Sequence, residues 1–273
     1  MEYITHSHRF AEAIIASDNE LLRRYNEFTH ALSSITEDEL IVDFERRKAE
    51  HALRGTSFKS LTPSINGLIK DRMQGISGWK DEVDIFNDKT GIISNTEWRL
   101  DFACDDAFCV EVAFNHGEAI AWNLLKPVLS CELNHVQKAV KGKLGIYVCA
   151  TELMKASANI DSTSGSYEKV LRYLPPMMNQ LTVPMMIIGL QPCESFKISA
   201  NADVIRKLQG LDDQWINKKV LVTARDYATF KGTVTSFISA SDSGTGVAQI
   251  VVKKSKKSTK TFNENEIRFL EFA

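Results

Sequence analysis

Apolar and polar residues follow a helical repeat in the first part of the chain. In residues 9–32, apolar side chains recur three and four positions apart, which predicts helix. The pair Ser17-Asp18 interrupts this repeat and predicts the cap of a second helix. Residues 37–54 form another helical segment, mostly polar, that Thr36 opens as a capping residue. We therefore expect residues 1–55 to be helical.

The pattern then changes to helices that alternate with short apolar runs. Residues 144–150 and 183–190 are apolar on both faces, which is typical of central strands in a covered sheet. Helices are expected at 65–73 with Ser64 as cap, at 117–140 with a kink or boundary at Pro127, and at 167–178. The polar segment 157–166 predicts a mobile loop. This order predicts an α/β fold, a mixed central β-sheet flanked by helices.

Two acidic residues stand in otherwise apolar strand sequence, within residues 98–115. A carboxylate in a buried strand is costly unless it is paired, hydrogen-bonded or bound to a metal. Strand alternation puts Glu111, Ala113 and Asn115 on one face, and Asp101 on the preceding strand can meet Glu111 across the hairpin. Two such oxygen ligands, with waters and a phosphate, suit Mg²⁺. The alternative is that Asp101 ends its strand in a turn and Glu111 is a paired structural carboxylate.

The composition of the chain changes near residue 205. A helix at 201–208 and a link at 210–213 are expected first. Short strands separated by turn residues are expected after them, at 219–224, 229–236, 246–253 and 267–272. The sequence therefore predicts two domains, a core over residues 1–208 and a small C-terminal β-barrel domain, SH3-like, over 209–273.

Five lysines gather beside one of the predicted barrel hairpins: Lys253, Lys254, Lys256, Lys257 and Lys260. Lysines on a sheet edge discourage pairing with other chains, so this cluster can be a solvated edge. Lysines also neutralise phosphates, so the cluster can equally be a DNA-binding surface. The sequence leaves both interpretations open.

The overall composition excludes several classes of protein. The chain has 273 residues and a formal net charge of −2, so its overall charge does not indicate a nucleic-acid-binding protein. It has no apolar run of about eighteen residues or more, which leaves no expected membrane span or membrane partner. The first residues lack the features of a signal peptide, and the five cysteines form no CxxC pair. We expect a cytoplasmic protein with reduced, mostly buried thiols.

A series of short motifs follows in order through residues 10–195. The motifs are Ser64–Lys70, Gly78–Lys80, Leu100–Phe102, Val110–Phe114, Gly145–Val148, Gly165–Glu168 and Val183–Leu190. In this order they resemble the BglII/BstYI group of type II restriction endonucleases. The resemblance implies the fold of the PD-(D/E)xK nuclease superfamily, which is a mixed sheet flanked by helices.

The resemblance also implies a function. It implies a restriction endonuclease of a restriction-modification system, a homodimer that uses Mg²⁺ to cut both strands of double-stranded DNA at a short palindromic site and leaves 5′-phosphates. By motif position, Asp101 and Glu111 correspond to the metal-binding carboxylates, and Glu82 to a further active-site residue. Asn66 and Lys70 lie on a helix that the family uses near DNA, although solvated polar positions are an equal alternative.

One position departs from the family pattern. Two residues after Glu111 the family has Gln, and related nucleases have Lys or Glu, but this chain has Ala113, which can neither orient water nor donate a hydrogen bond. Asn115 shares that face, and His116 follows as a candidate general base, with helix capping or phosphate contact as its alternative. Lys126 can neutralise charge in the transition state, but a solvated helix position is the favoured interpretation.

Two other hypotheses remain open at this point. The first, motivated by Ala113, is a DNA-binding protein of the same fold with lost or weakened catalysis. The second is an unrelated structural α/β protein with a barrel interaction module. Binding to duplex DNA at low salt separates the last hypothesis from the others, because a protein that contacts phosphates binds duplex with strong salt dependence.

Overall fold

The computed structural model describes residues 1–87, 98–132, 137–255 and 258–273. The chain divides into two compact units, Met1–Cys193 and Glu194–Ala273. Each unit is described by itself below.

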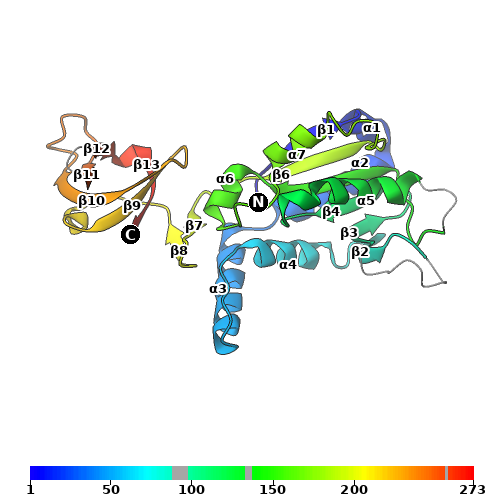
Figure 1. Ribbon diagram of the computed structural model, residues 1–273, viewed down its shortest axis with the longest axis horizontal. Helices are drawn as coiled ribbons and strands as arrows, with labels where there is room; N and C mark the ends of the chain where they lie inside the picture. The colour runs from blue at the N-terminus through cyan, green and yellow to red at the C-terminus, as the bar shows by residue number, and fades with distance from the viewer. Residues whose placement is uncertain (88–97, 133–136, 256–257) are drawn as a thin grey trace. The chain divides into compact units, whose positions relative to one another are not determined.

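The first unit is built on a six-stranded sheet with the strand order β1-β6-β5-β4-β3-β2 (Figure 1). The strands are β1 (Tyr3–His8), β2 (Trp79–Asp84), β3 (Arg99–Cys104), β4 (Phe108–Val112), β5 (Leu144–Ala150) and β6 (Met185–Leu190). Strands β4, β5 and β6 run parallel, whereas β1, β2 and β3 pair antiparallel with their neighbours. The predicted α/β fold with a mixed sheet is confirmed.

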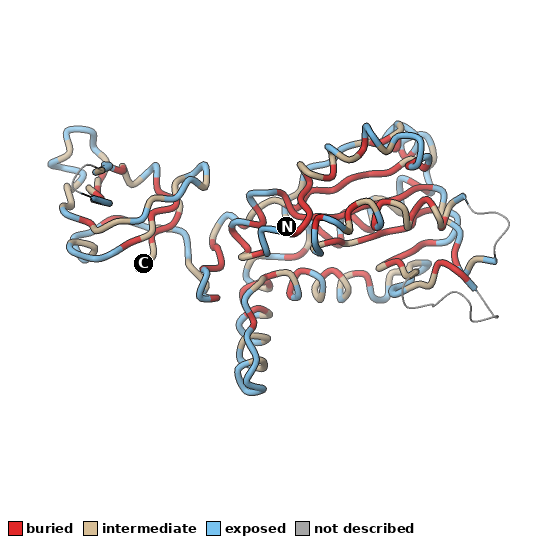
Figure 2. The backbone as a smooth tube through the Cα atoms, in the orientation of Figure 1, coloured by how far each residue is buried: buried red, intermediate tan, exposed pale blue. Residues whose placement is uncertain are grey.

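Helices cover both faces of this sheet. They are α1 (Ala11–Ser17), α2 (Asn19–Ser33), α3 (Glu37–Leu53), α4 (Thr62–Met73), α5 (Ile120–Glu132, after the 3₁₀ turn Gly117–Ala119), α6 (Glu152–Ser157) and α7 (Tyr167–Tyr173). Helices α5 and α7 pack on one face, where Leu124 and Val170 join the cluster around Tyr147. Helix α2 packs on the other face, where the centres of the Phe28 and Phe102 rings are 6.2 Å apart. Every residue of β5 and β6 is buried between these layers, as Figure 2 shows.

Two expectations for the helical regions are confirmed and one is wrong. The Asp18 side chain accepts hydrogen bonds from the first turn of α2, and Thr36 opens α3 with a capping box. Residues 3–8, however, form the edge strand β1 instead of helix, and they pair antiparallel with β6. The polar sequence of β1 does not predict a strand, because only its backbone pairing with β6 defines it.

The boundaries of three other segments also differ from expectation. Helix α4 begins at Thr62 with a proline in its first turn, so Ser64 is buried inside the helix and does not cap it. Helix α5 continues through Pro127 and ends at Glu132, so residues 137–140 are not helical. The segment 158–166 packs onto the domain instead of lying free, because the buried Lys155 ammonium donates to backbone carbonyls in it at 3.0 and 2.7 Å.

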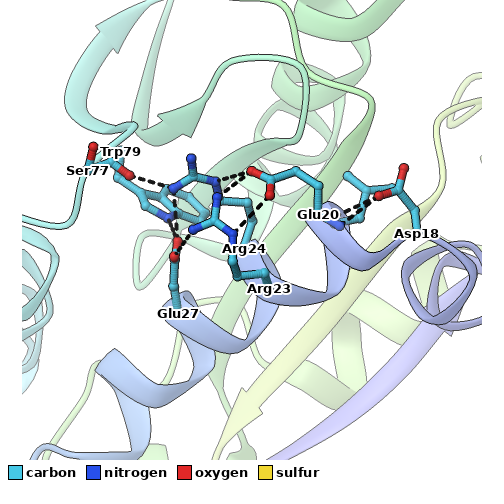
Figure 3. Close-up of polar contacts among 8 residues, drawn as sticks. Asp18, Glu20, Arg23, Arg24, Glu27, Ser77 and Trp79 are labelled. Atoms are coloured by element: carbon cyan, nitrogen blue, oxygen red, sulfur yellow. Dashed lines mark hydrogen bonds and ion pairs between the residues drawn. The ribbon is translucent and has the colours of Figure 1, made fainter.

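Strand β2 is fastened to helix α2 at its start (Figure 3). The Arg24 guanidinium donates to the carbonyl oxygen of Ser77 at 2.5 Å, and the Trp79 indole donates to Glu27 at 3.0 Å. Gly78 lies between them with φ +88°, and a Cβ there would lie 2.7 Å from an Arg24 nitrogen. These contacts fix β2, and with it Glu82, beside β3.

The second unit contains a five-stranded antiparallel sheet with the order β12-β11-β10-β9-β13. Its strands are β9 (Lys219–Ala224), β10 (Thr229–Ile238), β11 (Gln249–Ser255), β12 (Ser258–Asn263) and β13 (Ile267–Phe272), with 3₁₀ turns at Asp213–Trp215 and Glu264–Glu266. In the part of the chain that the structure describes, β12 and β13 are the outer strands and do not pair with each other, so the sheet is not a closed barrel. The short strands predicted for the C-terminal β-barrel domain are present, but they form an open sheet and not a closed barrel.

A short hairpin precedes this sheet in the second unit. Strand β7 (Phe196–Ile198) pairs antiparallel with β8 (Val204–Arg206). The helix expected at 201–208 is therefore wrong. Strand β12 was not predicted, because its mostly polar sequence, Ser258–Asn263, lacks the apolar alternation of the other strands. Across the described ranges, no helix has the length and apolarity needed to cross a membrane.

Candidate active site

The hairpin of β3 and β4 brings the two acidic strand residues together. Phe102 pairs with Val110, and the same register one residue further sets Asp101 opposite Glu111. The Asp101 carboxylate also accepts a hydrogen bond from the Val112 backbone N–H at 2.6 Å. Because successive side chains alternate between faces, both carboxylates lie on the face of the sheet that α5 covers. Asp101 therefore lies opposite Glu111 across the hairpin, as strand alternation predicts.

Glu111 is buried, and its two carboxylate oxygens differ in their hydrogen bonding. Its side chain is 6% exposed, and its Oε1 accepts a hydrogen bond from the Lys126 ammonium at 2.6 Å. Within the described residues, no hydrogen-bond donor reaches the buried Oε2. Burial, and then the charge of Asp101, raise the pKa of Glu111 to about 8 against the opposing effect of Lys126. Burial likewise raises the pKa of Asp101, although the Val112 N–H opposes that rise.

Lys126 corrects an expectation from the sequence. Its side chain is only 14% exposed and points at Glu111 from helix α5, so the solvated position favoured for it is wrong. Two neighbours of the lysine on α5, Ile120 and Leu124, belong to the apolar cluster over β4 and β5. Tertiary packing of α5 onto the sheet therefore brings a residue fifteen positions away in sequence to Glu111.

The carboxylate pair fits a divalent cation. Two facing carboxylates in apolar surroundings repel each other, and the unpartnered Glu111 oxygen needs either a proton or a cation. Taking only the described residues, no group of three or more His, Cys, Asp or Glu side chains could hold a metal. The site therefore offers two carboxylates, which water and a phosphate would complete. This set suits Mg²⁺, which keeps several waters and needs few protein ligands.

A cleft of about 370 Å³ opens beside Asp101. Glu82 from β2 and two α4 residues, Asn66 and Lys70, also line it. The Lys70 ammonium lies 3.0 Å from a carboxylate oxygen of Asp81 and 4.0 Å from one of Glu82. Four of the residues singled out from the sequence therefore share one cleft, although they come from three separate elements.

Glu82 has an unusual backbone conformation at this cleft. Its φ of 49° lies in the left-handed region, which few non-glycine residues adopt. The β2–β3 pairing runs through Asp81 with Phe102 and resumes at Val83 with Leu100, so Glu82 interrupts the ladder beside Asp101. Such strain costs about 1–3 kcal/mol and clusters at functional sites. Its charge contributes to the raised pKa of Asp101, so its carboxylate faces the same site.

The other predicted residues of this region make contacts of their own. The Asn115 side chain accepts a hydrogen bond from the Asn123 amide at 3.0 Å. His116 Nδ1 lies 2.7 Å from the Thr163 hydroxyl, which ties the end of β4 to the segment before α7. Ala113 is buried in the apolar cluster under α5. These contacts give Asn115 and His116 a role in holding the loop after β4.

The predicted DNA-binding lysines of the second unit are only partly described. Lys253 and Lys254 are exposed on β11. Lys256 and Lys257 lie outside the described residues. The Lys260 ammonium lies 4.7 Å from the centre of the Phe262 ring, so it is held against the sheet.

Arg47 also lies at this site, although the sequence does not single it out. It comes from α3 and lines the cleft, where its guanidinium donates to Asp43 at 2.5 Å. Its helical segment is polar on most positions, so nothing in the sequence distinguishes Arg47 from the solvated charges around it. Lys126 carried a weak signal, since it is a single cation within the apolar helix α5.

Comparison with known proteins identifies the family. A family model described as restriction endonuclease BglII/BglIII matches residues 3–190. The chain belongs to this family. It is therefore a type II site-specific deoxyribonuclease, and the resemblance of its ordered motifs is confirmed. The matched range includes the whole six-stranded sheet and both carboxylates.

The chain is also similar to solved structures. The crystal structure of restriction endonuclease BglII complexed with a DNA 16-mer has 15% sequence identity and a TM-score of 0.51, over 96% of this chain and 100% of that chain. Free BglII is also similar, with 14% identity and a TM-score of 0.43 over the same shares. No curated protein sequence matches the chain. At these identities, the complexed BglII structure supports the fold of this restriction endonuclease.

Proposed function

We propose that this endonuclease uses Mg²⁺ to hydrolyse both strands of duplex DNA at a short palindromic site and leaves 5′-phosphates. One observation carries the proposal: Asp101, partly buried at the edge of a cleft, faces the buried Glu111, one of whose oxygens is unpartnered among the described residues. A bound divalent cation would relieve both the repulsion and the missing contact.

Asp101 and Glu111 are the residues that would hold the cation. When bound, Mg²⁺ supplies a Lewis acid for the scissile phosphate and lowers the pKa of an attacking water. The Val112 N–H orients Asp101, and Lys126 orients Glu111. The oxygen of water forms a bond to phosphorus as the bond to O3′ breaks. Water loses a proton to solvent, and the leaving O3′ takes one up, which gives a 5′-phosphate and a 3′-hydroxyl.

Residues around the cleft would hold the DNA. Asn66 and Lys70 of α4, which line the cleft, would contact the backbone of the scissile strand, and Glu82 would assist at the phosphate. Lys253 and Lys254 would add phosphate contacts from the second unit, together with Lys256 and Lys257. BglII, the similar protein of known structure, was solved with DNA, which supports a double-stranded DNA partner for this chain.

Cleavage of both strands would require two copies of the chain. Each copy has one carboxylate pair and would cut one strand. A homodimer with two-fold symmetry places two such sites on the two strands of a palindrome.

The test is digestion of phage or genomic DNA, methylated and unmethylated, with Mg²⁺ and then with EDTA. Sequencing of the fragment ends should give a common palindromic site with 5′-phosphates, only in the presence of Mg²⁺. Duplex binding is measured in parallel by fluorescence anisotropy at two salt concentrations. Binding without cleavage of either DNA would overturn the proposal and favour a catalytically silent binder. Size-exclusion chromatography with light scattering tests the homodimer.

A further inference from the structure

The strand position that would carry a cationic or amide group in related nucleases is apolar here. Ala113 shares a strand face with Glu111, and its methyl group is buried against Ile120 and Leu124 of α5. An alanine neither donates a hydrogen bond nor carries charge. Another residue therefore has to stabilise the charge that develops on the phosphate during cleavage.

We infer that the Lys126 ammonium, delivered from helix α5, takes this role and contacts the scissile phosphate beside Glu111. The inference rests on the proposed function. Lys126 Nζ lies 2.6 Å from Glu111 Oε1, and this hydrogen bond uses one of its three N–H donors. Burial raises the pKa of both Asp101 and Glu111, and the charge of Lys126 opposes that rise in each, which agrees with an ammonium bonded to Glu111 and near Asp101.

The packing of α5 holds this ammonium in place. Pro127 follows Lys126 directly, and it lies against β5 so closely that a Cβ on Gly145 would be 2.9 Å from the proline Cβ. Glycine in β5 therefore lets the helix approach the sheet. A cation on a buried helix turn is a more rigid donor than one on an exposed side chain, and preorganised charge is what stabilises a transition state.

Lys70 is the rival cation at this site. It lines the cleft, but its ammonium lies 3.0 Å from Asp81 and 4.0 Å from Glu82 and is partly exposed. Two carboxylates other than Asp101 and Glu111 already neutralise it. Lys70 is therefore placed to bind DNA backbone at the rim, and Lys126 to act on the reacting phosphate.

Lys126 stays protonated while it assists the cleavage step. Water attacks phosphorus, the bond to O3′ breaks, and negative charge grows on the phosphate oxygens. The ammonium donates a hydrogen bond to that charge and keeps its proton throughout. Lys126 should therefore affect the rate of cleavage and leave the affinity for DNA without metal nearly unchanged.

The experiment measures single-turnover cleavage with Mg²⁺ and duplex affinity in EDTA for the wild type, Lys126→Met and Lys126→Gln. We expect cleavage to fall by about a hundredfold or more in both variants, with duplex affinity unchanged. Gln keeps a hydrogen-bond donor for Glu111 without the charge, so it separates charge from packing. Lys138→Met is the matched control, because Lys138 binds the Ser130 carbonyl at the end of the same helix, at 2.8 Å. Its cleavage rate should stay within about twofold of wild type.

Chemical rescue gives a second readout. Lys126→Cys treated with 2-bromoethylamine regains an ammonium of nearly the same length, and cleavage should return, whereas the same treatment of Lys126→Ala should restore nothing. The native cysteines are buried or half-buried, which limits side reactions. Unchanged cleavage in Lys126→Met, or no rescue in folded Lys126→Cys whose alkylation is confirmed by mass spectrometry, would overturn the inference alone. A wild type that binds duplex but never cleaves would overturn the proposed function as well.

Discussion

Two buried lysine–glutamate pairs in this protein have almost the same geometry and different surroundings. In the first unit, Lys126 and Glu111 are 2.6 Å apart, with side chains 14% and 6% exposed. In the second unit, Lys197 and Glu271 are 2.5 Å apart, with side chains 9% and 10% exposed. The distances and the burial alone do not tell a site from a structural contact.

The difference lies in what else each pair touches. The Lys197 ammonium also donates to the Thr223 hydroxyl at 2.9 Å and lies 5.7 Å from the centre of the Phe269 ring. Glu111 instead faces a second carboxylate, Asp101, and no described donor reaches its Oε2. A buried pair whose polar groups are satisfied stabilises one conformation, whereas an unsatisfied pair beside a like charge is costly and indicates a missing ligand.

The largest expected effect is on catalysis. Glu111→Gln should reduce single-turnover cleavage by about a thousandfold or more, because it removes a ligand and the charge that holds the cation. Glu271→Gln is the matched control at the other pair and should leave the cleavage rate at saturating enzyme within about threefold of wild type. An equal loss of cleavage rate in the two variants would show that the two lysine–glutamate pairs do not differ in function.

The second effect is on the stability of the second unit. Lys197→Met leaves Glu271 buried without its cation, which should cost about 3–5 kcal/mol. Hydrogen–deuterium exchange should show lost protection in β9 and β13, and unchanged protection in β5 of the first unit. Loss of protection in β5 as well would show that the pair does not act locally.

The third effect is a pH dependence of stability without metal. The pKa of Glu111 is raised from 4.5 to about 8 in the folded chain. As the pH rises through that window, the unfolded chain releases the proton first, so the folded state loses stability, and the loss is complete above the folded pKa. In EDTA, the melting temperature of wild type relative to Glu111→Gln should therefore fall by at least about 2 °C between pH 5 and pH 8. Parallel curves would contradict the assigned environment of Glu111.

The smallest effect concerns the third partner of Lys197. Thr223→Val keeps the shape of the side chain but removes its hydroxyl, which should cost about 1 kcal/mol by equilibrium denaturation of the second unit. Thr223→Ser keeps the hydroxyl and should retain more of that stability at the cost of one methyl group. If the valine variant were the more stable of the two, the hydroxyl would not contribute to the Lys197 site.

The fold and half of the site were predictable from local pattern. Strands 144–150 and 183–190 are apolar throughout, and alternation alone set Asp101 against Glu111. The edge strand β1 was not predictable, because its polar sequence becomes a strand only by pairing with β6. The mostly polar β12 was missed for the same reason.

The role of Lys126 depends on tertiary packing. In sequence it is the single cation of an apolar helix, a weak signal that does not by itself tell a buried lysine from a solvated one. The packing of α5 on the sheet, through its apolar cluster and the close contact of Pro127 with β5, brings the ammonium to Glu111. Likewise, the left-handed backbone of Glu82 is set by the interrupted β2–β3 ladder, which a sequence pattern does not encode.

Metal binding tests the central claim most directly. Calorimetric titration of Mn²⁺, as a tighter-binding substitute for Mg²⁺, is carried out on the wild type, Glu111→Gln and Glu271→Gln, each with bound duplex DNA that carries no cleavable site. The account predicts binding by the wild type and by Glu271→Gln, and at least tenfold weaker binding by Glu111→Gln. Equal Mn²⁺ affinity in all three proteins would contradict the assignment of Asp101 and Glu111 as the metal site.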